Sequence, residues 1–259
     1  MFSTIKLEIA NNIAYLILNR PELKNAVNSL MIEELHLCID ALIAQNNFNI
    51  LIITGSGNTF CSGADLNWLK EVSSHTYDEN YEESFRLIEL LYKIKEFPKP
   101  VIAKINGSAV GAGVGIMLSC DIIYATENAK FGLSEVSIGI VPAAIINFVI
   151  ERIGLTKAKE ILMTGNRINA IEAEKIGLIN SAYKKDELDL VIDTKINELL
   201  KNGSNAMKVV NEMINKVQFL SKQEIFDYVA TTVAELRLNL ECQEGITSFL
   251  EKREPNWRK

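Results

Sequence analysis

The feature that most constrains the fold is an alternation of short apolar runs with longer segments of helical periodicity. The runs Ile50–Thr54, Val101–Ile105 and Asp121–Ala125 are almost entirely apolar. Between the first two, apolar residues recur at helical spacing over Glu79–Ile94, and an earlier helix is predicted to begin with Ser29 as its N-cap. Strands apolar on both faces that alternate with helices are typical of a parallel sheet covered by helices, which predicts an α/β fold.

The two ends of the chain differ from this pattern. Two β-branched runs, Ile5–Ile9 and Ile13–Leu18, flank Asn11-Asn12 and predict a hairpin. After Ile140 the sequence predicts helix after helix, with a short strand at Leu178–Ala182 as the exception. We therefore expect an α/β core over residues 1–195 and a helical region over residues 196–259.

Charge and composition exclude several classes of protein. The chain of 259 residues has a net charge of −6 and no basic run, which argues against binding to nucleic acid. No apolar stretch approaches the roughly 20 residues that span a bilayer, so no membrane segment is expected. The four cysteines are scattered without metal-ligand spacing, as in a cytoplasmic protein. With only two histidines, no metal site is expected.

Three loops rich in small residues follow predicted strands. They are Phe60–Leu66, Asn106–Gly113 and Phe131–Glu135. Ligands of α/β sheets bind beyond the carboxyl ends of strands, where small residues let a ligand approach the backbone N–H groups. Two such donors aimed at one point can hold a developing oxyanion. Packing explains any one such loop more often, but three together favour a site.

Glu135 is the ionisable residue of most interest in these loops. Its neighbours in sequence are apolar, so burial would raise its pKa and suit it to proton transfer near neutral pH. The alternative is a structural glutamate that caps a helix or pairs with Arg152. Gly111-Ala112-Gly113 also suggests a dinucleotide loop, but the required third glycine is replaced by Ile116, which makes that signal weak.

Together these segments resemble the crotonase (enoyl-CoA hydratase/isomerase) superfamily along essentially the whole chain. Besides the three loops, the resemblance includes Asn19–Ala26, Cys120-Asp121-Ile122 and Pro142. It implies a spiral of ββα units whose C-terminal helices mediate a homotrimer or a hexamer made of two trimers. It also implies an acyl-CoA thioester as substrate, with no separate cofactor because CoA is part of the substrate.

The resemblance assigns roles to individual residues. The N–H groups of Ala64 and Ala112 would stabilise the enolate oxygen of the thioester, with Glu135 as the acid–base group. Trp68, Gly115 and Pro142 would line the substrate pocket. The residues expected to contact CoA are Lys24, Ala26, Ser62, Ala64, Asp65 and Leu66, joined by Phe249 and Lys252 from a neighbouring subunit.

The chain departs from the family pattern at Gly115, where hydratases with two glutamates carry the first of them. A single carboxylate favours an isomerase that moves a proton between C2 and C4 of a 3-enoyl thioester. Segments such as Gly63–Lys70 nevertheless resemble bacterial methylglutaconyl-CoA hydratases of leucine degradation, which also lack an acidic residue there. We therefore expect hydration of a 2-enoyl-CoA, with Δ3,Δ2-isomerisation and non-catalytic acyl-CoA binding as alternatives.

Overall fold

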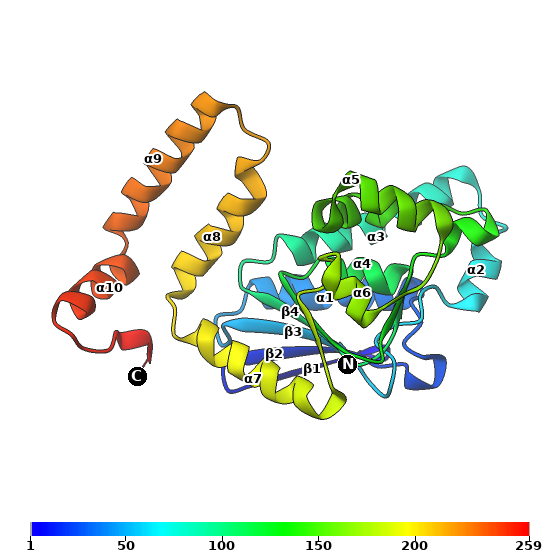
Figure 1. Cartoon of the computed structure of the whole chain (residues 1–259), viewed down its shortest axis with the longest axis horizontal. Coiled ribbons are helices and arrows are strands. Elements are labelled where there is room, and N and C mark those ends of the chain that lie inside the picture. The colour runs from blue at the N-terminus through cyan, green and yellow to red at the C-terminus, as the bar shows by residue number, and fades with distance from the viewer. Residues whose placement is uncertain (1, 259) are drawn as a thin grey trace. The chain divides into compact units, whose positions relative to one another are not determined.

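The computed structural model describes residues 2–258 and contains two compact units (Figure 1). The first extends from the N-terminus to Phe97 and continues over Val101–Ile192, and the second comprises Pro98–Pro100 and the chain from Asp193 onward. The predicted α/β class with a helical C-terminal part is confirmed. The predicted division into an α/β core (residues 1–195) and a C-terminal helical region that mediates trimerisation (residues 196–259) stays a prediction.

A six-stranded sheet forms the centre of the first unit, in the order β1-β2-β3-β4-β6-β9. Only β1 runs antiparallel to its neighbour; the other pairs are parallel. The strands are β1 (Ile5–Ala10), β2 (Ile13–Leu18), β3 (Ile50–Gly55), β4 (Val101–Ile105), β6 (Ile122–Thr126) and β9 (Ser181–Tyr183). The hairpin is confirmed, with Asn11 and Asn12 both at positive φ (52° and 63°), as a type I′ turn requires.

A second sheet of three short strands was not predicted. Its order is β5 (Ala109–Val110), β7 (Lys130–Gly132) and β8 (Ile168–Asn169). Strands of two or three residues are too short to show a period in sequence, which explains the omission. This sheet joins two of the small-residue loops.

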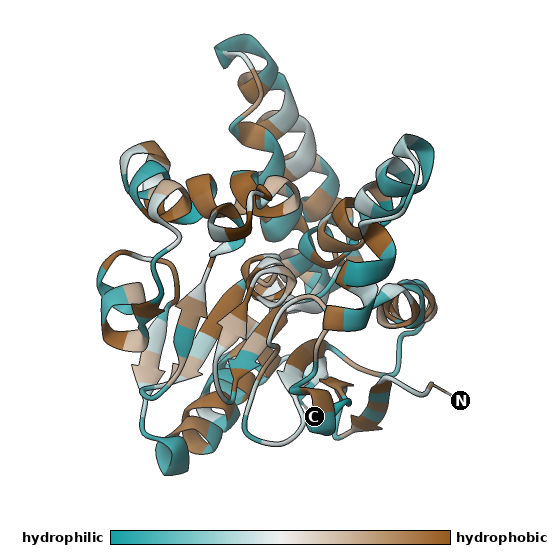
Figure 2. Ribbon diagram, turned by 90° about the vertical axis from the view of Figure 1, so that its right-hand side faces the viewer, coloured by the Kyte–Doolittle hydropathy of each residue, from teal (hydrophilic) through white to brown (hydrophobic). Residues whose placement is uncertain are grey.

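Helices cover the large sheet, and most of them combine hydrophobic and hydrophilic residues (Figure 2). In the first part of the chain they are α1 (Ser29–Ile43), α2 (Leu66–Val72), α3 (Tyr77–Lys95), α4 (Ala112–Leu118), α5 (Ile146–Thr164), α6 (Ala170–Lys175) and α7 (Lys185–Leu200). Short 3₁₀ helices are η1 (Pro21–Leu23), η2 (Glu135–Ile138), η3 (Ala143–Ile145) and η4 (Asn256–Arg258). The core is apolar and includes fully buried Leu16, Phe60 and Phe131.

Two local predictions were wrong. Ser29 is the first helical residue of α1, and the N-cap is Asn28, whose extended backbone lets its side chain accept a hydrogen bond from the Met31 N–H. The strand predicted over Leu178–Ala182 begins only at Ser181, because the preceding residues form turns.

The second unit contains α8 (Ser204–Val217), α9 (Lys222–Leu238) and α10 (Leu240–Leu250). Neither α8 nor α9 has a fully buried residue, and large apolar side chains such as Ile214, Phe226 and Leu240 are exposed. Among residues 2–258, no helix is both long enough and apolar enough to cross a bilayer.

Buried Glu34 of α1 anchors the start of β1. Its carboxylate accepts hydrogen bonds from the Ser3 N–H (2.7 Å), the Thr4 N–H (2.8 Å) and both hydroxyls. Burial alone would raise the pKa of Glu34, but these hydrogen bonds from Thr4 and Ser3 together outweigh it and lower the pKa. The charged form is therefore the one that stabilises the fold.

We expect Glu34→Gln to lower the free energy of unfolding by about 2 kcal/mol at neutral pH. The side-chain NH₂ group of glutamine cannot accept the two hydrogen bonds that the carboxylate oxygen in its place accepts. A carboxyl whose pKa is lowered in the folded state stabilises above its unfolded pKa of about 4.3, and this contribution is lost as the pH falls through the folded pKa. The difference between variant and wild type should therefore shrink in acid. Urea unfolding at a series of pH values measures it, and a difference that stays constant with pH would contradict the assignment.

Candidate active site

Backbone hydrogen bonds hold the three small-residue loops side by side. Cys61 forms a parallel bridge with Ala109, and Ala109 pairs in turn with Phe131. The Val110 N–H donates to the Cys61 carbonyl (3.0 Å). The Gly111 N–H donates to the Gly132 carbonyl (2.9 Å). The structure thus brings together the loops that the sequence placed in one candidate site.

Two glycines allow the first two loops to approach closely. Gly63 and Gly111 both have positive φ, of 95° and 51°. A Cβ atom on Gly111 would lie 3.7 Å from the Cα of Gly63 and 3.2 Å from Oε1 of Glu135. A Cβ on Gly63 would lie 3.2 Å from the Val110 carbonyl oxygen. Both the backbone conformation and the available space therefore require glycine here.

The amides of Ala64 and Ala112 donate no hydrogen bond within residues 2–258. Ala112 is the first residue of α4, so its N–H has no partner inside the helix. Ala64 forms a parallel bridge with Val27, in which the neighbours of Ala64 make the hydrogen bonds: Val27 N–H to Gly63 O, and Asp65 N–H to Val27 O. Its own N–H faces away from that partner. Two unpaired donors thus flank the contact between Gly63 and Gly111.

Glu135 begins η2, three residues after Gly132. Its Oε2 is buried and has no hydrogen-bond partner among residues 2–258, while Oε1 lies next to Gly111. Burial raises the pKa of Glu135 above its ordinary value. Pairing with Arg152, one of the two structural alternatives, is wrong, because the Arg152 guanidinium donates to the carbonyls of Cys120 and Asp121. A desolvated carboxylate with one unpartnered oxygen, next to the Gly111 that precedes an unpaired amide, is a combination suited to catalysis.

The residues expected to contact CoA in the first unit lie on two adjacent loops. The Ser62 N–H donates to the Lys24 carbonyl (3.0 Å), and Asn25 hydrogen-bonds the carbonyls of Ser56 and Thr59. Lys24 is exposed, and Leu66 is 74% exposed. These loops thus present Lys24, Ser62 and Leu66 together, and contact with CoA stays a prediction.

Asp65 and Ala26 are buried and face Arg20, a residue that sequence analysis did not single out. Arg20 forms an ion pair with Asp65 (2.8 Å) and donates to the Ala26 carbonyl (2.7 Å). The Asp65 carboxylate also caps α2 through the Asn67 N–H (2.9 Å), and this hydrogen bond, followed by Arg20, lowers the pKa of Asp65 against the effect of burial. The carboxylate therefore orders the loop, and the backbone of Asp65 is engaged as well, because its N–H donates to the Val27 carbonyl and its carbonyl accepts from the Leu69 N–H.

Gly115 is enclosed by apolar side chains. A Cβ at this position would collide with the Cγ2 of Ile145 and come within 3.1 Å of Leu91. Pro142, also buried, immediately precedes the 3₁₀ helix that carries Ile145. The space that a carboxylate side chain would need at position 115 is therefore filled by hydrocarbon. Trp68, on α2, is half-buried against the core.

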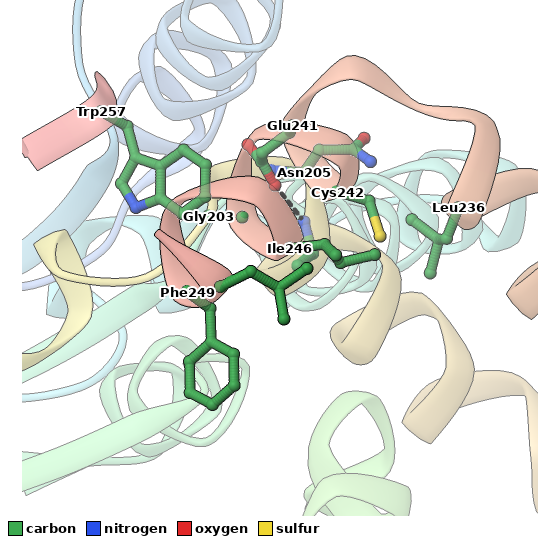
Figure 3. A pocket seen from close by; sticks show the side chains of 11 residues that line it. Gly203, Asn205, Leu236, Glu241, Cys242, Ile246, Phe249 and Trp257 are labelled. Carbon is green, nitrogen blue, oxygen red and sulfur yellow. Dashed lines mark hydrogen bonds between the residues drawn. The ribbon is translucent and has the colours of Figure 1, made fainter. Parts of the chain in front are cut away.

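Phe249 and Lys252 belong to the second unit. Phe249 is 83% exposed on α10, and it lines a cavity of about 500 Å³ together with Ile246, Leu236 and Trp257 (Figure 3). This cavity is formed entirely by residues 203–257 and contains none of the loop residues described above. Contact of Phe249 and Lys252 with the CoA of a neighbouring subunit stays a prediction.

Comparison with known proteins agrees with the geometry. The family model described as enoyl-CoA hydratase/isomerase matches residues 8–259. A crotonyl-CoA hydratase of Syntrophomonas wolfei is 32% identical over 99% of this chain and 98% of its own length. A trans-2-decenoyl-[acyl-carrier-protein] isomerase of Streptococcus mutans is 30% identical over 99% of this chain and 98% of its own length.

Solved structures show the same fold. The crystal structure of an enoyl-CoA hydratase from Shewanella pealeana superposes with a TM-score of 0.95 at 29% identity, covering 99% of this chain and 96% of that one. The predicted crotonase-type fold is confirmed. Closeness to methylglutaconyl-CoA hydratases in particular stays a prediction. The matched length, the fold and the convergence of the three loops lead to one conclusion: this chain is an enzyme of the enoyl-CoA hydratase/isomerase family.

Proposed function

We propose that this enzyme adds water across the double bond of a 2-enoyl-CoA thioester. The observation that carries the proposal is the carboxylate of Glu135, which has a buried Oε2 without a partner among residues 2–258 and lies with Oε1 next to Gly111. The amides of Ala112, which follows Gly111, and of the nearby Ala64 are unpaired within the same residues. Relatives named as enoyl-CoA hydratases support the choice of reaction.

The proposed reaction uses each of these groups in turn. Glu135 orients a water molecule, whose oxygen bonds to C3 while the electrons of the double bond move towards the thioester oxygen. The N–H groups of Ala64 and Ala112 stabilise the negative charge that develops there. Glu135 takes the proton of the water and returns it to C2, so that the elements of water are added in balance. CoA is carried by the substrate, and the residues named above need no separate cofactor or metal for these steps.

The CoA part is assigned to the exposed loops around Lys24 and Ser62, with Ala26, Asp65 and Leu66 as the further predicted contacts. Lys24 supplies a cation for a phosphate group, although the chain as a whole is acidic. The unpaired cysteines, three of them buried, support a cytoplasmic location.

Isomerisation of a 3-enoyl-CoA is the second candidate, and Gly115 favours it. Ile145 and Leu91 fill the place of a second carboxylate, and one base is enough to move a proton between C2 and C4. The Streptococcus mutans relative is itself named an isomerase. Because the chain belongs to a family of enzymes, the non-catalytic alternative is dropped.

Product analysis separates the two reactions. We expect crotonyl-CoA to gain one water molecule and 3-hexenoyl-CoA to be left largely unconverted, as followed by mass spectrometry and chromatography of the products. Conversion of 3-hexenoyl-CoA to the 2-isomer without hydration of crotonyl-CoA would overturn the hydratase assignment. Adding 3-methylglutaconyl-CoA to the same assay tests the finer substrate prediction from the resemblance.

We further propose that the enzyme assembles as a homotrimer or a hexamer through its C-terminal helices. The exposed apolar residues Val210 and Ile214 lie on one face of α8, and Phe226 and Val233 on α9 are exposed as well. Covering such surfaces is favourable by about 25 cal/mol per Å². Light scattering coupled to size exclusion should give three or six times the chain mass of 28.9 kDa. A monomer mass would contradict the proposal.

A further inference from the structure

One carboxylate outside the candidate site connects several elements around it. Glu83, on α3, accepts hydrogen bonds at Oε1 from the Trp68 Nε1–H of α2 (2.9 Å) and from the Ser29 hydroxyl at the start of α1 (3.1 Å). Its Oε2 lies 3.4 Å from Nδ1 of His75, in the segment between α2 and α3. Three helices and a connecting segment therefore meet at a single side chain.

Helix α2 depends on such contacts because none of its residues is fully buried. At its N-terminal end, Asp65 caps the helix and pairs with Arg20. One turn later, Trp68 packs half-buried against the core, and its indole N–H donates to Glu83. Ala64, whose amide is one of the two unpaired donors, directly precedes Asp65. The position of α2 thus determines both the course of the chain after that amide and the orientation of the Trp68 ring.

We propose that Glu83 is a positioning residue that holds Trp68, and with it α2, in the substrate-binding arrangement. This inference rests on the proposed function and on the prediction from the family resemblance that Trp68 lines the substrate pocket. Glu83 touches neither substrate nor reacting atoms; it acts through the indole that it holds.

The geometry also identifies which carboxylate oxygen of Glu83 holds Trp68. Both hydrogen bonds go to Oε1, whereas Nδ1 of His75 is buried near Oε2 without a hydrogen bond. Glutamine keeps a carbonyl oxygen at the Oε1 position and places an NH₂ group towards His75, whose ring nitrogen can accept a hydrogen bond. Glu83→Gln should therefore preserve the arrangement, and Glu83→Leu should abolish it.

Indole fluorescence makes this measurable, because the chain has two tryptophans and Trp257 lies in the second unit. In a Trp257→Phe background we expect Glu83→Leu to shift the emission of Trp68 to longer wavelength. KM for crotonyl-CoA should rise about tenfold, the equivalent of one hydrogen bond, with kcat changed less than about threefold. Glu83→Gln should match the parent in both emission and KM. Trp68→Phe, which removes the N–H and keeps a ring, should raise KM as much as Glu83→Leu, and the double variant should show no further loss.

Glu82→Leu is the matched control, because Glu82 is the exposed neighbour on the same helix. Unchanged emission or KM in Glu83→Leu would overturn the proposal, as would a Glu83→Gln variant impaired as much as Glu83→Leu. If the parent enzyme neither hydrated nor isomerised any enoyl-CoA, the proposed function would fail. The emission of Trp68 and the affinity for crotonyl-CoA, measured by calorimetry, would still decide the role of Glu83.

Discussion

Replacing Glu135 with glutamine is expected to lower kcat for 2-enoyl-CoA hydration by about 10²–10⁴, the usual contribution of a positioned acid–base group. Glutamine fills the same space beside Gly111 but can neither accept nor return the proton. Because burial raises the pKa of Glu135, kcat/KM should fall as the pH drops through that raised pKa, above the ordinary range of a glutamate. Initial rates across a pH series measure both effects.

Glu127→Gln is the control for this substitution, because Glu127 is exposed and lies outside the three loops. It should keep the activity and the pH profile of the wild type. Binding of crotonyl-CoA should survive in Glu135→Gln, since the thioester oxygen still meets the two amides. A Glu135→Gln enzyme with normal kcat would exclude this carboxylate as the proton carrier.

Gly111→Ala is expected to lower kcat by about 10²-fold, the effect of displacing catalytic groups by about 1 Å. The added methyl group would lie 3.2 Å from Oε1 of Glu135, so the carboxylate has to move. The backbone at φ 51° and ψ −121° also disfavours any residue with a Cβ, which would disturb the amide of Ala112 that follows. Steady-state kinetics, with circular dichroism to establish folding, test this expectation.

The Gly154→Ala variant distinguishes the effect of backbone strain from the effect of displacing the Glu135 carboxylate. Gly154 has a similar positive φ of 71°, but a Cβ there meets nothing within 4 Å. It should therefore lower the thermal unfolding temperature while leaving kcat unchanged. If Gly154→Ala and Gly111→Ala lost activity to the same extent, backbone strain and not the displacement of Glu135 would explain the loss.

Much of the architecture follows from local sequence signals. The strand Val101–Ile105 has the predicted bounds, and the Asn11-Asn12 hairpin forms where expected, because apolar runs and turn residues act within a few positions. The three loops are recognisable for a related reason. Small residues in Phe60–Leu66 and Asn106–Gly113 are required by the close approach of Gly63 and Gly111, so the constraint is visible in composition.

Contacts between distant residues could not be predicted in this way. Arg20 pairs with Asp65 and Trp68 with Glu83 only because the fold brings their elements together. Strand β8, with two residues, has no period of its own and exists through its pairing with β7. The filling of the space at Gly115 by Ile145 likewise depends on how α4 and η3 pack.

The bridge from Cys61 through Ala109 to Phe131 has a consequence for how such an enzyme diversifies. It fixes two main-chain donors, which every residue except proline supplies, so mutation of the Ala64 or Ala112 side chain leaves the donor in place. In the proposed reaction, Glu135 is then the single side chain that takes part in the chemistry. The predicted wall of the substrate pocket can then change with the acyl group while the two main-chain donors stay in place.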